Sequence, residues 1–112
     1  MIHGPRDVRV EQVPDPQVHR PTDAVVRVVA TCVCGSVLWG YRGVRPTDRP
    51  HRIGHEFIGV VEQVGDDVAR VAVGDVVIAP FYVCCGECLN CRNGVSTSCL
   101  VGGWWGSTVR DL

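Results

Sequence analysis

The sequence predicts a mainly β fold, a small β-barrel that carries a metal-binding loop as an insertion. Valine-rich segments of strand length recur along the chain, and 13 glycines and 7 prolines are spread between them as turn formers. No long segment has the apolar periodicity of a helix. Four cysteines stand close together near the carboxyl end, which indicates a compact lobe inserted into the barrel.

The first half of the chain predicts two strands and one helical turn. Val8, Val10 and Val13 frame a short alternating strand at residues 8–13, and Pro14 and Pro16 end this strand. Residues 24–31 are rich in β-branched valine, which favours a buried strand. The glycine-punctuated segment that follows predicts one helical turn beginning near Ser36.

The second half predicts a loop and two further strand units. Residues 42–52 combine two prolines with four arginines, which predicts a solvated loop. Residues 57–64 form a second strong strand, followed by a Gly-Asp-Asp turn. Residues 71–79 predict a third strand unit, interrupted by the turn Gly74-Asp75 before the cysteine lobe begins.

Length and charge restrict the classes of function. With 112 residues the chain is expected to form one small domain, and a net charge of -1 gives no basic surface for nucleic acid. No apolar run approaches the roughly 20 residues that span a bilayer. The first ten residues are polar and charged, unlike an export signal, so we expect a cytoplasmic protein without a membrane partner.

The cysteine array near the carboxyl end predicts a structural zinc site. Its thiols are separated by two, two and seven residues, a spacing that can converge on one tetrahedral ion. Turn-forming residues between the thiols suit a chain wrapped around a cation. We therefore expect a zinc lobe at about residues 84–100, with the ligands Cys85, Cys88, Cys91 and Cys99.

Two other interpretations of this array remain open. Iron–sulfur proteins of the bacterial ferredoxin type begin with the same spacing, but there the fourth cysteine follows after three residues and precedes proline. A disulfide framework fits poorly with 7 cysteines, an odd number, and with the absence of an export signal. Cys84 would break the two-two spacing and is interpreted as a spare thiol.

A second group of chemically active residues is formed by Cys34, Ser36, His55 and Glu56. Cys34 follows one predicted strand and His55 precedes the next, so paired strands would bring thiol and imidazole together on one ion. The alternative is a small buried thiol and an ordinary loop histidine. Spacing alone leaves both interpretations open.

Four ordered motifs resemble the zinc-dependent alcohol dehydrogenases of the medium-chain dehydrogenase/reductase superfamily, from about Gly4 to Gly106. They are Cys34-Gly-Ser-Val-Leu, Gly54-His-Glu-Phe-x-Gly, Gly74-Asp-Val-Val and the four-cysteine lobe. The resemblance implies a GroES-like β-barrel, the N-terminal part of the catalytic domain. It also implies a small alcohol or aldehyde as substrate and NAD(P) as hydride acceptor.

The resemblance implies a role for each residue of the second group. Cys34 and His55 match two ligands of the catalytic zinc, which acts as a Lewis acid on the alcohol oxygen. Ser36 matches the hydroxyl that begins the proton relay, and Glu56 matches an acidic group beside the zinc.

The chain also departs from the family. It has no Gly-x-Gly-x-x-Gly fingerprint of a Rossmann domain, and the family's third catalytic zinc ligand lies beyond its last residue. Val37 replaces an aspartate that orients the ligand histidine, and Trp39 replaces a relay histidine. Residues 107–112 read as an off-family tail. We therefore expect a truncated or frameshifted fragment; the alternatives to an enzyme are an inactive zinc-binding domain and an unstable remnant, and the oligomeric state is not predicted.

Overall fold

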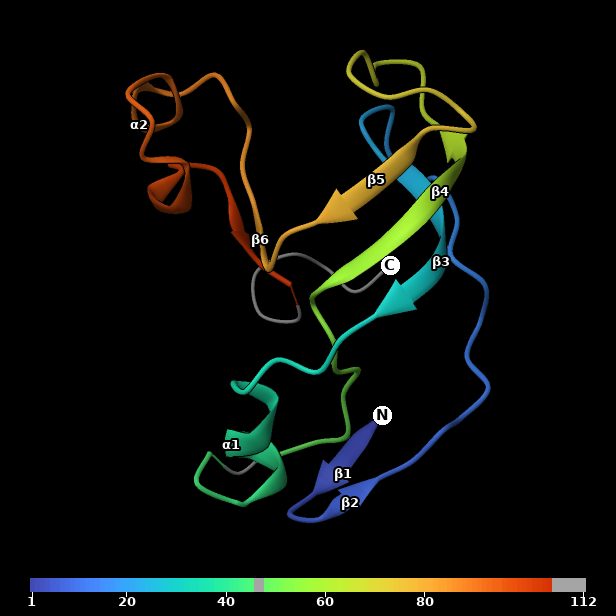
Figure 1. Ribbon diagram of the computed structural model, residues 1–112, viewed down its shortest axis with the longest axis vertical. Coiled ribbons are helices and arrows are strands. Elements are labelled where there is room, and N and C mark those ends of the chain that lie inside the picture. The colour runs from blue at the N-terminus through green and yellow to red at the C-terminus, as the bar shows by residue number, and fades with distance from the viewer. Residues whose placement is uncertain (46–47, 106–112) are drawn as a thin grey trace.

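The computed structural model describes residues 1–45 and 48–105, and the expected tail at 107–112 lies outside this range. The described chain is mainly β, as predicted, and its helices are short. In chain order its elements are β1 (Ile2–Gly4), β2 (Asp7–Val8), β3 (Ala24–Thr31), α1 (Val37–Tyr41), β4 (Phe57–Val64), β5 (Val76–Ala79), β6 (Tyr82–Val83), α2 (Leu89–Arg92), a 3-10 turn (Ser96–Ser98) and β7 (Gly103–Trp104) (Figure 1).

The largest sheet is antiparallel, in the order β3-β4-β5. The predicted boundaries of β3 and β4 are confirmed, and their register pairs Ala24 with Val64 and Thr31 with Phe57. Gly59 permits the close approach of these strands, because a Cβ at this position would lie 2.6 Å from the carbonyl oxygen of Arg27. The strands of the described residues form this open sheet and two two-stranded ribbons, and closure into a barrel stays a prediction.

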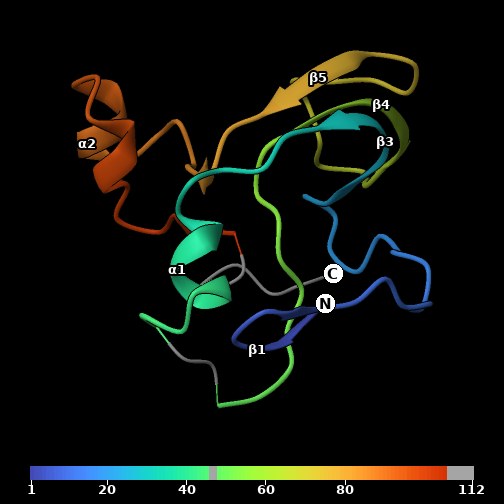
Figure 2. The same cartoon turned by 60° about the horizontal axis from the view of Figure 1, so that its bottom comes forward.

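The strand predicted at residues 8–13 is wrong beyond its first residue. Only Val8 belongs to a strand, and the side chain of Val10 is fully exposed. Its pairing partner β1 is short and matches Ile2 with Val8, so the later valines have no strand beside them. Ile2 itself is one of two fully buried side chains in the described part of the chain and forms a β-bridge to His51. The β1–β2 ribbon therefore packs beside α1 (Figure 2).

The predicted helical turn is confirmed as α1, which begins directly after Ser36. The strand predicted at 71–73 is wrong, because these residues lead into a turn instead. The Asp75 carboxylate accepts a hydrogen bond from the amide of Ala72 at 2.8 Å, and Gly74 has φ +96°. The strand β5 then starts at Val76, as the sequence predicts.

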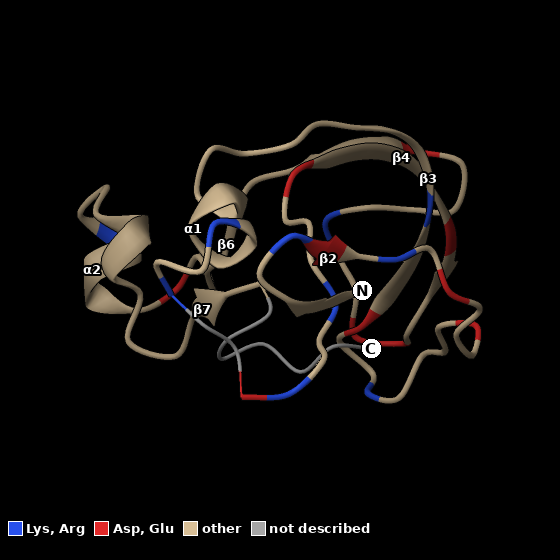
Figure 3. Cartoon of the chain, turned by 90° about the horizontal axis from the view of Figure 1, so that it is seen from below, with Lys and Arg blue, Asp and Glu red and all other residues tan. Residues whose placement is uncertain are grey.

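The cysteine lobe lies to one side of the large sheet (Figure 1). It contains α2 and the 3-10 turn, and the ribbon β6–β7 pairs Tyr82 with Trp104 where the chain enters and leaves it. The Trp105 indole donates a hydrogen bond to the carbonyl of Pro80 at 2.8 Å. Acidic and basic residues are interspersed along the described chain (Figure 3). Within the described residues, no helix has the length and apolarity needed to cross a membrane.

Candidate metal centres

The four lobe cysteines converge on one point. The Sγ atoms of the four thiols all lie within 4.8 Å of one another. The Sγ of Cys99 lies 3.6 Å from that of Cys85 and 3.9 Å from that of Cys88. A tetrahedral zinc with Zn–S bonds of about 2.3 Å requires a sulfur–sulfur separation of about 3.8 Å. A disulfide would need about 2.05 Å, so the arrangement fits a tetrathiolate zinc site and not a disulfide.

Backbone amides of the lobe point at the sulfurs. The amides of Glu87 and Cys88 donate to the Sγ of Cys85 at 3.4 and 3.3 Å, and the amide of Cys85 donates to the Sγ of Cys99 at 3.3 Å. Gly86, with φ +75°, makes this tight turn without strain. Donors fixed by the backbone favour thiolates, the form in which cysteine binds a metal.

The pKa values of the lobe thiols move in opposite directions. Hydrogen bonds from the amides of Leu100 and Cys91 lower the pKa of Cys88 to about 6, and the amides of Cys85 and Val101 lower the pKa of Cys99. Burial among the other sulfurs raises the pKa of Cys91 to about 12. A lobe that holds thiolates and a thiol together can ionise fully only when a cation offsets the crowded negative charge.

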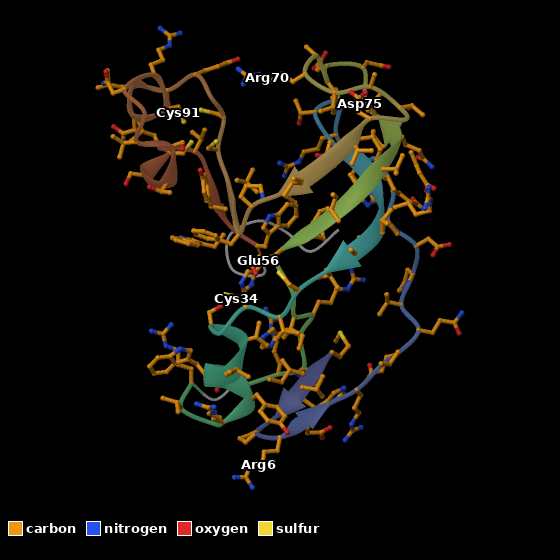
Figure 4. All side chains as sticks on the ribbon, viewed as in Figure 1. Arg6, Cys34, Glu56, Arg70, Asp75 and Cys91 are labelled. Carbon is orange, nitrogen blue, oxygen red and sulfur yellow. The ribbon has the colours of Figure 1, made fainter. Side chains whose placement is uncertain are left out.

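The second centre is positioned by the pairing of β3 with β4. Cys34 follows the end of β3, and His55 and Glu56 directly precede β4. Because Thr31 pairs with Phe57, these two segments leave the sheet at the same edge. The donor atoms of Cys34, His55 and Glu56 lie within 4.8 Å of one another. Figure 4 shows Cys34 and Glu56 together near this edge, well separated from Cys91 in the lobe.

Ser36 joins the two ligand types of this centre. It is the N-cap residue of α1, yet its hydroxyl makes no capping hydrogen bond. Its Oγ instead donates to the Sγ of Cys34 at 3.3 Å and lies 3.3 Å from Nε2 of His55. The hydrogen bonds from Ser36 and then from His55 lower the pKa of Cys34, which favours its thiolate. A thiolate, an imidazole and a carboxylate are a suitable donor set for zinc.

Sequence reasoning missed Cys32, which contacts this centre through Glu56. The Cys32 thiol donates a hydrogen bond to Oε2 of Glu56 at 3.1 Å, and this contact raises the pKa of Cys32. The register of the two strands would have revealed it, because the residue after Thr31 lies opposite the residue before Phe57. The signal was therefore present only in the strand pairing and not in a local motif.

A groove of about 580 Å³ opens beside Cys32 and Glu56. Its remaining lining is predominantly apolar and comes from β3, β4, β5 and the segment after β5, including Ala30, Ile58 and Phe81. This volume lies within the range of small-molecule sites. Trp39 is not among the residues that line it, and the Arg45 guanidinium lies 5.7 Å from the centre of the Trp39 ring instead.

The sequence analysis named two groups of residues, and in the structure the members of each group lie close together. The four lobe cysteines form one cluster, and Cys34, His55 and Glu56 form the other, with Ser36 in contact with two of them. Cys84 is exposed and belongs to neither cluster.

Comparison with known proteins agrees with this geometry. Residues 20–110 match the alcohol dehydrogenase GroES-like domain family. A zinc-type alcohol dehydrogenase-like protein of Bacillus subtilis (strain 168) is 40% identical over 97 residues, which are 86% of this chain and 26% of that protein. Formaldehyde dismutase of Pseudomonas putida is 40% identical over 104 residues, covering 88% of this chain and 26% of that protein.

The fold gives the same result. The solved alcohol dehydrogenase TADH from Thermus sp. ATN1 superposes with a TM-score of 0.84 and 38% identity, over 94% of this chain and 30% of that chain. The chain thus spans between a quarter and a third of the length of these relatives. It belongs to the zinc-type alcohol dehydrogenases and corresponds to their GroES-like domain.

Proposed function

We propose that this chain is the zinc-bearing N-terminal part of a zinc-dependent, NAD(P)-dependent alcohol dehydrogenase that interconverts a small alcohol and its aldehyde. The observation that carries the proposal is the Cys34–Ser36–His55 arrangement, in which one hydroxyl contacts both a thiol and an imidazole. We also propose a cytoplasmic location, because both clusters need reduced thiols to bind metal.

The residues present assign roles to this centre. Cys34 and His55 would hold a catalytic zinc with Glu56 beside them, and a bound zinc would supply Lewis acidity toward the substrate oxygen. Ser36 would accept the substrate's hydroxyl proton. With Trp39 in place of a relay histidine, Ser36 would pass its proton to water or to the cofactor. The apolar groove beside Glu56 would receive the carbon skeleton of the substrate.

The substrate class and the cofactor follow from kinship. The relatives named above include alcohol dehydrogenases and a formaldehyde dismutase, which supports a small alcohol or aldehyde as substrate. Alcohol oxidation transfers a hydride, and NAD(P) is the acceptor that this family uses. The whole protein's turnover belongs to this proposal, since the chain spans about a quarter of the curated relatives' length.

A second candidate function is a structural zinc domain without chemistry. It is favoured by the sulfur–sulfur separations of 3.6 and 3.9 Å in the lobe, which fit a tetrathiolate site. Cys34 and His55 would then be an incomplete centre that holds no ion.

Metal content of the purified chain separates the two functions. We expect about two zinc ions per chain if both centres form, and one if only the lobe binds. The double variant Cys34→Ser/His55→Ala should reduce the content to one, whereas Cys84→Ser, which alters a thiol outside both clusters, should leave it at two. A wild-type content of one zinc that the double variant does not change would support the structural domain and defeat the enzyme proposal.

The ligand set of the lobe is tested separately by Cys88→Ser. Because a hydroxyl is a poor zinc ligand, this variant should lose the lobe zinc and unfold at a lower temperature. Inductively coupled plasma analysis and thermal unfolding measure the two effects. Unchanged zinc content in Cys88→Ser would contradict the assignment of this residue.

A fluorescence titration with NADH on the same samples measures whether the 112-residue chain binds nicotinamide.

A further inference from the structure

The Cys32 thiol makes a contact that the proposed reaction does not use. It donates a hydrogen bond to Oε2 of Glu56 at 3.1 Å. The backbone fixes both partners, because the Cys32 amide donates to the Glu56 carbonyl at 3.4 Å and the Thr31 hydroxyl donates to the same carbonyl at 2.7 Å. The side-chain contact is therefore a consequence of the β3–β4 register, extended by one residue.

Glu56 connects this thiol to the other two members of the second centre. One of its carboxylate oxygens falls within 4.8 Å of the donor atoms of Cys34 and His55, whereas Cys32 is not part of that cluster. A carboxylate that accepts a hydrogen bond is a weaker donor to a cation and is less free to turn. The hydrogen bond of the Cys32 side chain toward this centre is therefore the one that it donates to Glu56.

We propose that Cys32 is a positioning residue, which holds the Glu56 carboxylate and limits its contribution to metal binding at Cys34 and His55. The inference rests on the proposed function, since it requires a metal at that centre. Catalytic zinc sites keep one coordination position open for substrate. A carboxylate restrained by Cys32, at the edge of the groove that both residues line, would be less free to occupy that position.

Cobalt binding tests this role without measuring turnover. The lobe is first filled with one equivalent of Zn²⁺, which Co²⁺ displaces poorly because zinc stands above cobalt in the Irving–Williams order. Co²⁺ is then titrated into the second centre and followed by its thiolate charge-transfer absorption. Removing the restraint with Cys32→Ala should tighten Co²⁺ binding roughly tenfold, the effect of freeing one charged acceptor.

Three variants control the measurement. Cys32→Ser retains a hydrogen-bond donor and should bind Co²⁺ like the wild type. Cys84→Ala removes an exposed thiol outside both clusters and should also change nothing. In a Glu56→Gln background, Cys32→Ala should have no further effect, because the two residues act as one unit.

The outcomes distinguish the two proposals. If no variant takes up Co²⁺ at the second centre, the proposed function fails, and this inference fails with it. If Co²⁺ binds but Cys32→Ala leaves its affinity unchanged, or if Cys32→Ser behaves like Cys32→Ala, only the positioning role is overturned.

An infrared measurement tests the contact in the metal-free protein. The S–H stretching band of Cys32 is identified by difference against Cys32→Ser. Its frequency should rise in Glu56→Gln, because an amide oxygen accepts a weaker hydrogen bond than a carboxylate. An unchanged frequency would overturn the inference.

Discussion

At the scale of single residues, the direction of each thiol's pKa shift follows from what points at its sulfur. Cys88 receives backbone amides, which lower its pKa to about 6, whereas burial dominates at Cys91 and raises its pKa to about 12. Adjacent ligands of one proposed ion therefore differ in ionisation before any metal binds. We expect a cation to bind more readily to the Cys88 thiolate, and its binding to displace the proton of Cys91.

The pH dependence of the metal-free lobe tests whether the pKa of Cys88 is lowered in the folded chain. A thiol whose pKa is depressed on folding contributes stability above the pKa of the unfolded thiol, and this stability is lost as pH falls through about 6. In chelated protein we expect a step in ultraviolet thiolate absorbance near pH 6 that Cys88→Ser removes. Cys84→Ser should keep the step, and a wild-type chain without any step below pH 7 would contradict the amide contacts.

Val37 stands where the resemblance to the family implies an aspartate beside the ligand histidine. It opens α1, and its amide donates to the carbonyl of Cys34 at 3.1 Å. Val37→Asp would restore an acidic partner for the ligand histidine, and such partners typically change metal affinity about 10–100-fold. We expect higher zinc occupancy at Cys34 and His55, measured by metal analysis at limiting zinc. Val37→Asn is the matched control, because asparagine has the shape of aspartate without its charge. Equal zinc occupancy in the wild type, Val37→Asp and Val37→Asn would contradict a role for an acidic partner at this position.

At the scale of elements, the register of β3 and β4 places the second centre. The antiparallel pairing runs from Ala24–Val64 to Thr31–Phe57, and its register shifts between Val25 and Val26 and again between Val28 and Ala30. Cys34 and His55 lie just beyond its end, so any displacement of the strands changes their separation. A one-residue slip would exchange the faces of β4 and separate the two ligands.

Gly59→Ala probes this register. The new Cβ would lie 2.6 Å from both the Arg27 carbonyl oxygen and a methyl group of Val26. Forcing these strands apart should cost about 1–3 kcal/mol of unfolding free energy and reduce zinc at Cys34 and His55. Gly4→Ala, whose Cβ meets nothing within 4 Å, is the control for denaturant unfolding. Equal denaturation midpoints for Gly59→Ala and Gly4→Ala would show that β3 and β4 tolerate a wider spacing.

At the scale of the whole molecule, the chain is expanded for its size. It exposes 8370 Å², whereas a folded monomer of 12.2 kDa exposes about 6,100 Å². Its radius of gyration is 15.3 Å, against about 13 Å expected for this length. Ile2 and Val61 are the fully buried side chains among the described residues, and Ile78 is 78% exposed on β5. Hydrophobic burial is thus thin among the described residues, and we expect metal binding to contribute a correspondingly larger share of the stability.

Removing the metal with a chelator tests how much metal binding contributes to the stability of the fold. Structural zinc contributes an apparent binding free energy of about 10–16 kcal/mol in small zinc domains, comparable with the whole stability of a domain. We expect EDTA to lower the midpoint of thermal unfolding by more than about 10 °C, followed by circular dichroism. EDTA presaturated with zinc is the control. An ordered, metal-free chain whose midpoint does not respond to chelator would refute the dependence on metal.

The sequence by itself determined those features that depend on residues close together in the chain. The strands β3 and β4 follow from runs of β-branched residues, and the four lobe cysteines follow from a spacing contained within fifteen residues. Tertiary structure decided which residues lie opposite one another. It placed Ile2 in the core, left Val10 exposed, and set Cys32 against Glu56, 24 residues away. The physical reason is that strand pairing depends on long-range register and on available partners, which no local pattern specifies.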